Sequence, residues 1–370
     1  MATVILKATE KCNSNCYYCD VVRKQETGTS MPLDILELAF IRFDSYLKSY
    51  PEERIDILWH GGEPLLLGAE YYRSAIELQE QHCPETKSRI KHSVQTNLTC
   101  FTEDFVDIFR KLGITAVGTS FDPEPNMRGP GRKIDSQKYN KRFINALSIL
   151  EGHGFGWGMI YVVTKKSLLR PLDVFFFLTN LKLTGGVNFN PVLIYDEERK
   201  DVAITPAEYV EFLGAIFPYW WKNRHRYPDI EPFKSLVKNI IDGHRSLGCV
   251  DSGSCTYHHI NLAPDGETSQ CGRSADWGLL PYGNIKDRSI EEILGDGQRR
   301  QLADRVEYLR DNDCDGCRFW DLCHGGCPLD AYSKHSDFMY KSEWCGAKKG
   351  FIEKYFEPIT GAKFKPREKS

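Results

Sequence analysis

Six short β-rich runs alternate with amphipathic helical segments over the first 224 residues, and this alternation constrains the fold more than any other feature of the chain. In the helical segments, apolar residues recur with a 3.6-residue period. The sixth helical segment begins at a capping box of Thr205 and Glu208, with Pro206 at its first helical position. We therefore expect an α/β protein built on a partial (β/α)6 TIM barrel. The expected strands are residues 3–9, 55–62, 92–97, 116–122, 156–163 and 185–194.

Polar motifs follow the first four expected strands at the point where each strand ends. Three cysteines follow the first, "GGEP" (61–64) ends the second, "QTN" (95–97) ends the third and "SFD" (120–122) ends the fourth. The carboxyl ends of parallel strands meet at one rim of such a barrel, where the chemistry of this architecture lies. The four motifs are therefore predicted to converge on one site.

The pattern changes near Trp220, and we expect the βα alternation not to resume beyond it. The expected divisions are a barrel (1–224), a bridging region (225–247), a small cysteine-rich domain (248–346), and a C-terminal helix and tail (347–370). A hairpin pattern surrounds Pro264-Asp265-Gly266 inside the cysteine-rich part. The basic cluster of residues 222–226 is interpreted as a solvated helix end.

Charge and hydropathy argue for a cytoplasmic protein without nucleic-acid or membrane partners. The net charge is −3 with both signs interspersed, and no apolar run reaches membrane-spanning length. A β-rich run follows Met1 at once, which leaves no room for a signal peptide or for a leader-recognition domain before the barrel. Thirteen cysteines in such a chain favour metal ligation over disulfides, because the cytosol keeps thiols reduced.

The first cysteine group contains three thiols within eight residues, Cys12, Cys16 and Cys19. A structural zinc site would need four ligands, and the nearest further cysteines, Cys83 and Cys100, do not have ligand spacing. Three thiolates suit a [4Fe-4S] cluster with one open iron, which is a reactive site. The spacing alone leaves a structural metal or buried free thiols as alternatives.

The second cysteine group contains eight residues in the final third of the chain. Four-thiolate sites hold either zinc or iron-sulfur clusters, and the C-x2-C-x5-C-x3-C segment alone does not decide between them. Eleven of the thirteen cysteines belong to the two groups, and Cys83 and Cys100 are expected to be ordinary buried thiols. The eight are Cys249, Cys255, Cys271, Cys314, Cys317, Cys323, Cys327 and Cys345.

The C-x3-C-x2-C spacing together with "GGEP" resembles the radical S-adenosylmethionine (SAM) superfamily, and the second group resembles the SPASM domain. The resemblance implies a SAM-binding [4Fe-4S] cluster on the first group and two auxiliary [4Fe-4S] clusters on the second. By position, one auxiliary cluster is held by Cys249, Cys255, Cys271 and Cys327, and the outer one by Cys314, Cys317, Cys323 and Cys345. The implied SAM contacts are Tyr18, Gly61, Gly62, Glu63, Pro64, Ser120, Asn145 and Val192.

The resemblance also implies a function, the oxidation of a peptide or protein side chain by a 5′-deoxyadenosyl radical. "WHGGEPLL" (59–66) is similar to enzymes that modify ribosomally made peptides, which favours C–H activation and a crosslink such as a cyclophane. Two enzyme alternatives remain, an anaerobic sulfatase-maturating enzyme that makes formylglycine and a small-molecule radical SAM dehydrogenase. A zinc scaffold and a simple iron-sulfur electron carrier are alternatives of other classes. A flavodoxin or ferredoxin is the expected electron donor.

The base that accepts the substrate proton separates the two peptide-level functions. Sulfatase-maturating enzymes have an Asp directly after the third SPASM cysteine, whereas this chain has Gly272 there. Asp276, a few residues further on, and Asp122, in "SFD", are the candidate bases. The glycine therefore argues against formylglycine formation.

Overall fold

The computed structural model describes residues 1–19, 28–130, 135–181, 183–194, 197–244 and 246–366. The chain forms two compact units, one of residues 1–158 and 257–299 and the other of residues 159–256 and 300–370. Among the described residues, none of the helices has both the length and the apolar character that crossing a bilayer requires. The predicted domain boundaries differ from this division and remain a prediction.

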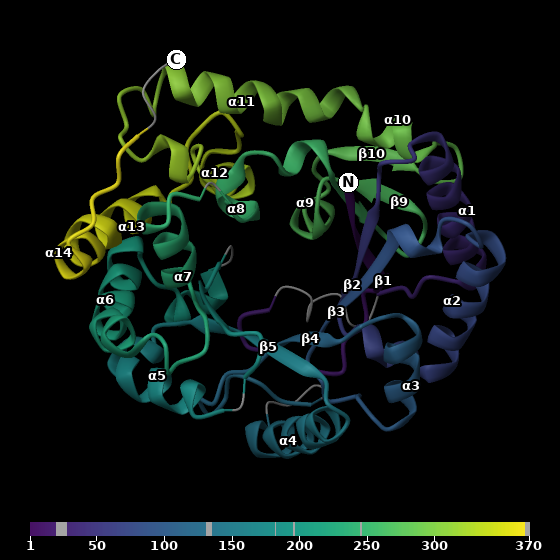
Figure 1. Cartoon of the computed structure of the whole chain (residues 1–370), viewed down its shortest axis with the longest axis horizontal. Helices are drawn as coiled ribbons and strands as arrows, with labels where there is room; N and C mark the ends of the chain where they lie inside the picture. The colour runs from purple at the N-terminus through teal and green to yellow at the C-terminus, as the bar shows by residue number, and fades with distance from the viewer. Residues whose placement is uncertain (20–27, 131–134, 182, 195–196, 245, 367–370) are drawn as a thin grey trace. The chain divides into compact units, whose positions relative to one another are not determined.

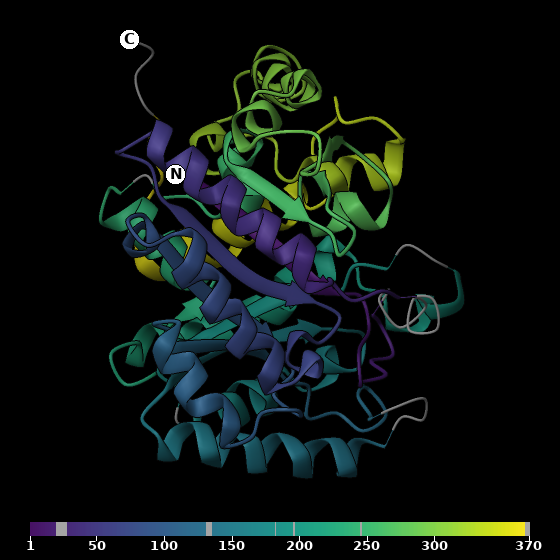
Figure 2. The same ribbon diagram turned by 90° about the vertical axis from the view of Figure 1, so that its right-hand side faces the viewer.

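The first unit contains a sheet in the order β10-β9-β8-β1-β2-β3-β4. Strands β1 to β4 run parallel in chain order, and α1, α2 and α3 lie side by side along them (Figures 1 and 2). Its elements are β1 (Ala2–Thr9), α1 (Leu33–Ser49), β2 (Ile55–Gly61), η2 (Pro64–Leu67), α2 (Ala69–His82), η3 (Lys87–Arg89), β3 (Ile90–Thr96), α3 (Asp104–Lys111), β4 (Ala116–Ser120), α4 (Ser136–Gly152), β8 (His259–Leu262), β9 (Glu267–Ser269), α9 (Gly272–Asp276), β10 (Pro281–Asn284), α10 (Ile290–Leu294) and η8 (Gly297–Arg299).

The predicted hairpin is confirmed and has a role that the sequence did not indicate. Strands β8 and β9 pair antiparallel around the predicted turn, and β8 also pairs parallel with β1, with Thr3 opposite His259. The hairpin therefore extends the sheet of the first unit, although it follows β1 by some 250 positions in the sequence.

The second unit contains β5, β6 and β7 in that order, with β6 parallel to both neighbours. Strand β7 corrects the expectation that the alternation ends after α6. At two residues it is too short to give a periodic signal. Its elements are β5 (Gly156–Val163, which begins in the first unit), η4 (Ser167–Leu169), α5 (Pro171–Thr179), β6 (Val187–Pro191), η5 (Glu197–Val202), α6 (Pro206–Asn223), β7 (Ile230–Glu231), α7 (Phe233–Leu236), η6 (Val237–Ile241), α8 (Cys249–Ser252), η7 (Cys255–Tyr257, which ends in the first unit), α11 (Arg300–Asp311), η9 (Trp320–Leu322), α12 (Pro328–His335), α13 (Cys345–Phe351), η10 (Ile352–Phe356) and α14 (Glu357–Thr360).

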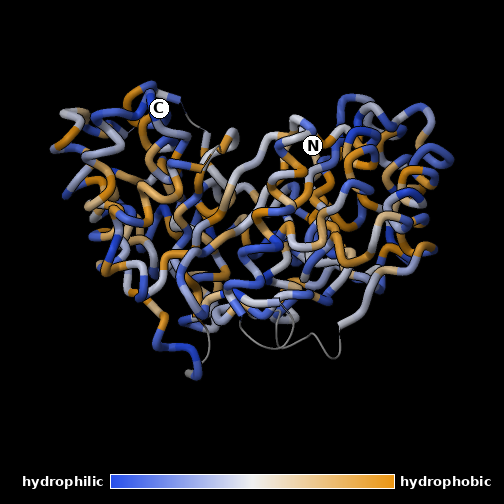
Figure 3. Tube along the Cα trace, turned by 90° about the horizontal axis from the view of Figure 1, so that it is seen from below, coloured by the Kyte–Doolittle hydropathy of each residue, from blue (hydrophilic) through white to orange (hydrophobic). Residues whose placement is uncertain are grey.

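Aromatic side chains form much of the core in both units. In the first unit Trp59 of β2 is fully buried, with its ring centroid 5.0 Å from that of Tyr72 on α2. In the second, Phe217 of α6 contacts Phe233 and Phe351, at centroid distances of 5.1 and 5.4 Å. Along the tube in Figure 3 the helices alternate between hydrophilic and hydrophobic stretches, as expected for helices that bury one face.

Candidate active site and cysteine groups

The three-cysteine loop follows β1 and is held in place by the segment after β4. The Asn15 N–H donates to the Gly129 carbonyl at 2.7 Å, and the Tyr17 N–H donates to the Met127 carbonyl at 2.9 Å. Burial raises the pKa of the Cys12 thiol to about 12, and nearby Cys16 and Cys19 contribute. The three thiols are therefore brought together in a largely buried place.

This thiol group suits a cluster better than a single ion. Among the described residues, no group of three or more His, Cys, Asp or Glu side chains closes around one metal ion. A four-iron cluster keeps its ligands further apart, because each thiolate binds a different iron. The donor set of three thiols therefore fits the predicted SAM-binding cluster.

The GGEP segment packs against the backbone that leads into the cysteine loop. The Gly62 N–H donates to the Thr9 carbonyl at 2.8 Å, and the Glu63 N–H donates to the Lys11 carbonyl at 2.9 Å. A Cβ on Gly61 would collide with the Thr9 carbonyl, and one on Gly62 would collide with that of Lys11. Both glycines are therefore needed for the close approach of two backbones.

The Glu63 carboxylate connects the ends of β2 and β3. It is fully buried and accepts hydrogen bonds from the Leu65 N–H (3.0 Å), the Thr96 hydroxyl (2.6 Å) and the Asn97 N–H (2.7 Å). Burial raises the pKa of Glu63 to about 7. Asn97 in turn donates to the Ser14 hydroxyl in the cysteine loop, at 3.0 Å. These bonds give Glu63 a structural role in addition to the contact predicted with the SAM ammonium group.

Tyr18 and Asp122 belong to a buried network around Arg128, which the sequence analysis missed. The Tyr18 hydroxyl donates to Asp122 at 2.5 Å, and Arg128 Nε donates to the same carboxylate oxygen at 2.5 Å. The Asp122 side chain is only 1% exposed. This carboxylate is already bonded to a guanidinium and a phenol, which makes it a poor candidate for the base. Arg128 lies in an irregular loop, where no periodicity marks a buried charge.

The remaining predicted SAM contacts differ in their surroundings. Ser120, at the end of β4, accepts a hydrogen bond from Gln95 Nε2 at 3.2 Å. Asn145 is exposed on α4, away from the face that this helix buries. Val192 lies in the second unit, where its N–H donates to the Val163 carbonyl at 2.9 Å. Of these, Asn145 is the least suited to a buried ligand contact.

Asn140, in the first turns of α4, is a further polar residue that the sequence analysis missed. Its amide oxygen is buried and has no hydrogen-bond partner among the described residues. A buried amide oxygen without a partner is costly, so Asn140 suits a ligand contact better than Asn145 does. The sequence signal was weak, because both asparagines lie in one amphipathic segment.

Asp276 ends α9 and forms an ion pair with Lys7 of β1. Lys7 lies directly opposite His60 of β2 in the parallel register. Burial lowers the pKa of His60, with Lys7 contributing, so the imidazole is neutral at neutral pH. Gly272 begins the same short helix, and a Cβ there would meet no atom within 4 Å. Space for a side chain at position 272 is thus available and unused.

Within the second unit, the four cysteines predicted to bind the outer cluster are close to one another. Burial raises the pKa of Cys314, and nearby Cys345 and Cys317 add to the effect. Burial also raises the pKa of Cys323 to about 11, with Cys345 again contributing. Lys349 is near three of these thiols and adds positive charge. The donor set therefore fits a cluster with four thiolate ligands.

The other four cysteines of the second group are divided between the units. Cys271 caps α9 in the first unit, whereas Cys249, Cys255 and Cys327 belong to the second. This ligand set stays a prediction.

The two leftover cysteines differ in burial. Cys83 is fully buried beside the Phe40 carbonyl, as predicted. Cys100 is partly exposed, because it follows β3 in the loop that contacts Asn13, whose side chain donates to its sulfur at 3.0 Å. The prediction of a buried thiol is therefore wrong for Cys100.

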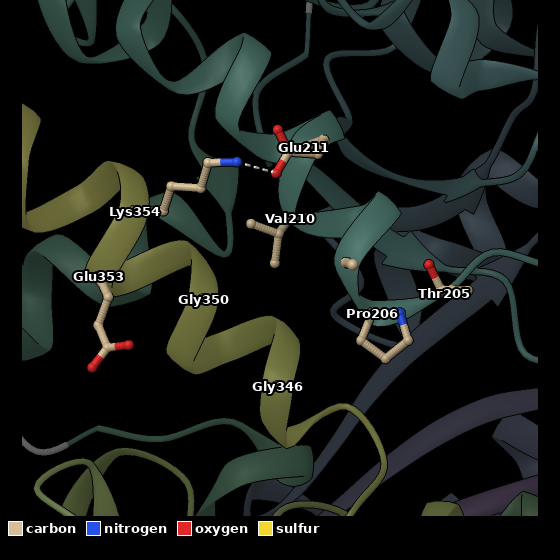
Figure 4. Close-up of a pocket in the computed structure, with 9 residues that line it drawn as sticks. Thr205, Pro206, Val210, Glu211, Gly346, Gly350, Glu353 and Lys354 are labelled. Atoms are coloured by element: carbon tan, nitrogen blue, oxygen red, sulfur yellow. Dashed lines mark hydrogen bonds and ion pairs between the residues drawn. The ribbon is translucent and has the colours of Figure 1, made fainter.

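A pocket in the second unit lies between the start of α6 and the helical segments α13 and η10 (Figure 4). Its lining includes an ion pair between Lys354 and Glu211, at 2.6 Å. None of the predicted site residues lines it.

Comparison with known proteins gives relatives over nearly the whole chain. A cysteine-type anaerobic sulfatase-maturating enzyme of Clostridium novyi is 25% identical over 97% of this chain and 96% of its own length. A serine-type anaerobic sulfatase-maturating enzyme of Bacteroides thetaiotaomicron is 24% identical over 88% of this chain and 82% of its own length.

Solved structures agree with the fold. Native anSMEcpe with bound AdoMet and the Cp18Cys peptide superimposes with a TM-score of 0.83 at 22% identity, covering 97% of this chain and 98% of that one. Streptococcus suis SuiB bound to the precursor peptide SuiA gives 0.64 at 16% identity, covering 93% and 75%. The predicted α/β partial-barrel class is thereby confirmed. Residues 6–176 match the model of the radical SAM superfamily, in agreement with the resemblance carried by the three-cysteine spacing together with GGEP.

Proposed function

We propose that this protein is a radical SAM/SPASM enzyme that oxidises a side chain of a ribosomally made peptide and forms a crosslink. The observation that carries the crosslinking part is Gly272, which has room for a carboxylate and lacks one. The peptide part is supported by the solved relatives, two of which contain a bound peptide.

The cofactors belong to the radical SAM chemistry. Members of this superfamily use a [4Fe-4S] cluster and SAM, which together supply a 5′-deoxyadenosyl radical for hydrogen abstraction. Cys12, Cys16 and Cys19 would hold that cluster. The GGEP backbone, Tyr18, Ser120 and Asn140 would hold SAM, with Asn140 taking the place first assigned to Asn145. The two auxiliary clusters would accept the electron that leaves the substrate. A flavodoxin or ferredoxin would supply the electron that reduces the SAM-binding cluster.

The protein itself would supply a base that accepts the substrate proton, and Asp276 is a better candidate for this base than Asp122. It lies four residues after Gly272 on one short helix, which puts both positions on the same helix face. Its side chain is 24% exposed, against 1% for Asp122. Lys7 forms an ion pair with it. The proton would leave the substrate for Asp276.

The second candidate function is formylglycine formation. It is favoured by the similarity to sulfatase-maturating enzymes along almost the full length of both chains. In this function Asp276 would have to replace the missing Asp at position 272.

A sulfatase-motif peptide separates the two candidates. Reconstituted enzyme with SAM and a reductant is incubated with Cys and Ser versions of the peptide, and mass spectrometry follows the aldehyde. We expect 5′-deoxyadenosine without aldehyde from the wild type, and some aldehyde from Gly272→Asp, because the added side chain has space. The matched control is Gly152→Ala, which also has free space but lies at the end of α4. Efficient aldehyde formation by the wild type would establish the second candidate instead.

The crosslink itself is tested by searching beside the enzyme's gene for a short open reading frame and expressing the encoded peptide together with the enzyme. A peptide product two mass units lighter, with a new side-chain bond in its fragmentation spectrum, is expected. Asp276→Asn should lower its yield while 5′-deoxyadenosine is still made. An unmodified peptide would contradict the proposal.

A further inference from the structure

Arg305, on α11 of the second unit, is a buried cation in the cysteine-rich region. Only 1% of the residue is exposed, and it is among the largest fully buried side chains of the described chain. Arginine stays protonated in proteins, so its positive charge is buried with it. A buried charge of this kind requires compensation from its surroundings.

Its hydrogen bonds all go to backbone carbonyls of two segments that carry cysteines. Two acceptors are Gly326 and Gly325, at 3.0 and 3.1 Å, which lie between Cys323 and Cys327. The other two are Phe338 and Tyr340, at 2.6 and 2.8 Å, in the segment that leads to Cys345. One guanidinium therefore joins two segments that each supply predicted cluster ligands.

The segment 325–326 depends on this support. Gly325 and Gly326 both have positive φ, of 81° and 75°. Two successive left-handed residues turn their carbonyls away from any regular hydrogen-bond ladder. The Arg305 guanidinium donates to both carbonyls, and the Gly325 carbonyl also accepts from the Ser342 N–H at 2.8 Å. Together these bonds fix the turn between Cys323 and Cys327.

The groups near Arg305 that would be negative as cluster-bound thiolates are mainly cysteines. No carboxylate is hydrogen-bonded to its guanidinium in the described structure. The groups that favour its charge are Cys327, Cys314 and Cys255, followed by Asp330. Cys314 belongs to the predicted outer cluster, whereas Cys327 and Cys255 belong to the other auxiliary cluster. The charge is thus shared between the two predicted ligand sets.

We propose that Arg305 is a positioning residue for both auxiliary clusters, holding their ligand segments through four carbonyls and raising their reduction potentials through its buried positive charge. The inference rests on the proposed presence of these two clusters. Net charge and hydrogen bonding around a cluster set its potential, and a nearby cation favours the reduced, more negative state.

The test uses the full chain with Cys12, Cys16 and Cys19 changed to Ala, so that only auxiliary clusters give signals. Arg305→Met removes charge and contacts, whereas Arg305→Lys keeps the charge and loses the planar fork. Potentiometric titration followed by electron paramagnetic resonance measures both midpoint potentials, and an iron assay measures cluster content. We expect lower potentials for both clusters in the Met variant, and potentials close to the parent in the Lys variant.

Arg89→Met is the matched control. Arg89 also donates to four backbone carbonyls, those of Leu47, Tyr50, Pro51 and Glu53, but these lie in the first unit beside α1. It should lower thermal stability without moving either potential.

The iron content and the potentials separate the presence of the auxiliary clusters from the role of Arg305. Parent protein with about eight irons establishes both auxiliary clusters, whereas none or four would refute the cluster proposal itself. Unchanged potentials in Arg305→Met at full iron content would overturn the role of Arg305. If the Met variant loses iron, retention of iron and potential in Arg305→Lys supports the proposal. Loss of iron in both variants and in Arg89→Met would indicate general destabilisation and overturn it.

Discussion

The two cysteine groups differ in how their thiols are surrounded by charge. Near the three-cysteine loop the buried charges are balanced, Arg128 by Asp122 and Glu63 by three hydrogen-bond donors. Near the four-cysteine group of the second unit cations predominate: Lys348 is paired with Asp251, whereas Lys349 and Arg305 have thiols as their main negative neighbours when these bind as thiolates.

This difference corresponds to two kinds of site. Cations beside four thiolates offset the negative charge of a closed cluster, which suits a site that stores or passes electrons. A charge-balanced, glycine-lined loop with three thiolates leaves room for a ligand that brings its own ammonium and carboxylate groups. If the two sites have these different roles, substitutions in one should leave the function of the other intact.

Changing Cys12, Cys16 and Cys19 together to Ala should abolish SAM cleavage, because the open iron is lost with its cluster. Iron content should fall from about twelve to about eight per chain. Chromatography of 5′-deoxyadenosine and an iron assay measure the two effects. Continued production of 5′-deoxyadenosine would refute the assignment of the reactive site.

Cys345→Ala should affect only the four-cysteine group of the second unit. Loss of one of four thiolates should remove the outer cluster, so that about eight irons remain, and product should decrease while SAM cleavage persists. The matched control is Cys83→Ala, at a buried thiol outside both groups, which should keep all of the iron. A complete loss of SAM cleavage in Cys345→Ala would show that the two sites are not separable.

Gly62→Ala tests the close packing of GGEP against the cysteine loop. The added methyl group would collide with the Lys11 carbonyl and displace one of the two backbones. A displacement of about 1 Å at a reactive centre costs on the order of 100-fold in rate, and we expect a loss of that size in SAM cleavage. Wild-type rates in this variant would exclude a positioning role for the segment.

Asp122→Asn tests the charge balance near the three-cysteine loop. It leaves Arg128 buried without its carboxylate, which should lower the free energy of unfolding by about 3 kcal/mol. Asp107→Asn is the control, since Asp107 pairs with Arg110 on the exposed face of α3 and should change stability by less than about 0.5 kcal/mol. If chemical denaturation gives the same loss of unfolding free energy for Asp122→Asn and Asp107→Asn, this result would argue against a buried ion pair at Asp122.

Glu63→Gln has an expected effect that depends on pH. The folded state raises the pKa of Glu63 from 4.5 to about 7, so the folded state binds more protons between these values. Its contribution is therefore most favourable below pH 4.5 and is lost as pH rises through 7, by up to about 3 kcal/mol. The free energy of unfolding of wild type and variant is measured without metal at pH 5 and pH 7.5. Between these two values the wild type should lose stability relative to Glu63→Gln. If the stability difference is the same at both pH values, the pKa of Glu63 in the folded state lies near its ordinary value.

Periodicity and spacing were sufficient for much of the first unit. The predicted strand over residues 3–9 differs from β1 by one residue, and the predicted strand over residues 156–163, which begins in this unit, matches β5 residue for residue. Two predicted strands extend beyond the observed ones. Strand β4 ends at Ser120, before Asp122, which binds Arg128. Strand β6 ends at Pro191, which has no N–H to donate within a sheet.

Buried polar residues were the main failure. Arg128, Asn140 and Arg305 carry no periodic signal, because what matters for them is which carbonyls, thiols or carboxylates other segments bring near. The resemblance implied Asn145 as a SAM contact, whereas the packed helix exposes Asn145 and buries the amide oxygen of Asn140.

The sequence by itself determined the type of chemistry, because thiol spacing and a glycine pair are local features that a cluster and a close backbone approach require within a few residues. The tertiary structure decided which polar groups are neutralised and which remain available. Burial and ion pairing depend on neighbours from distant segments, and for that reason Asp122 and Asp276, equivalent as carboxylates in the sequence, have different surroundings in the folded chain.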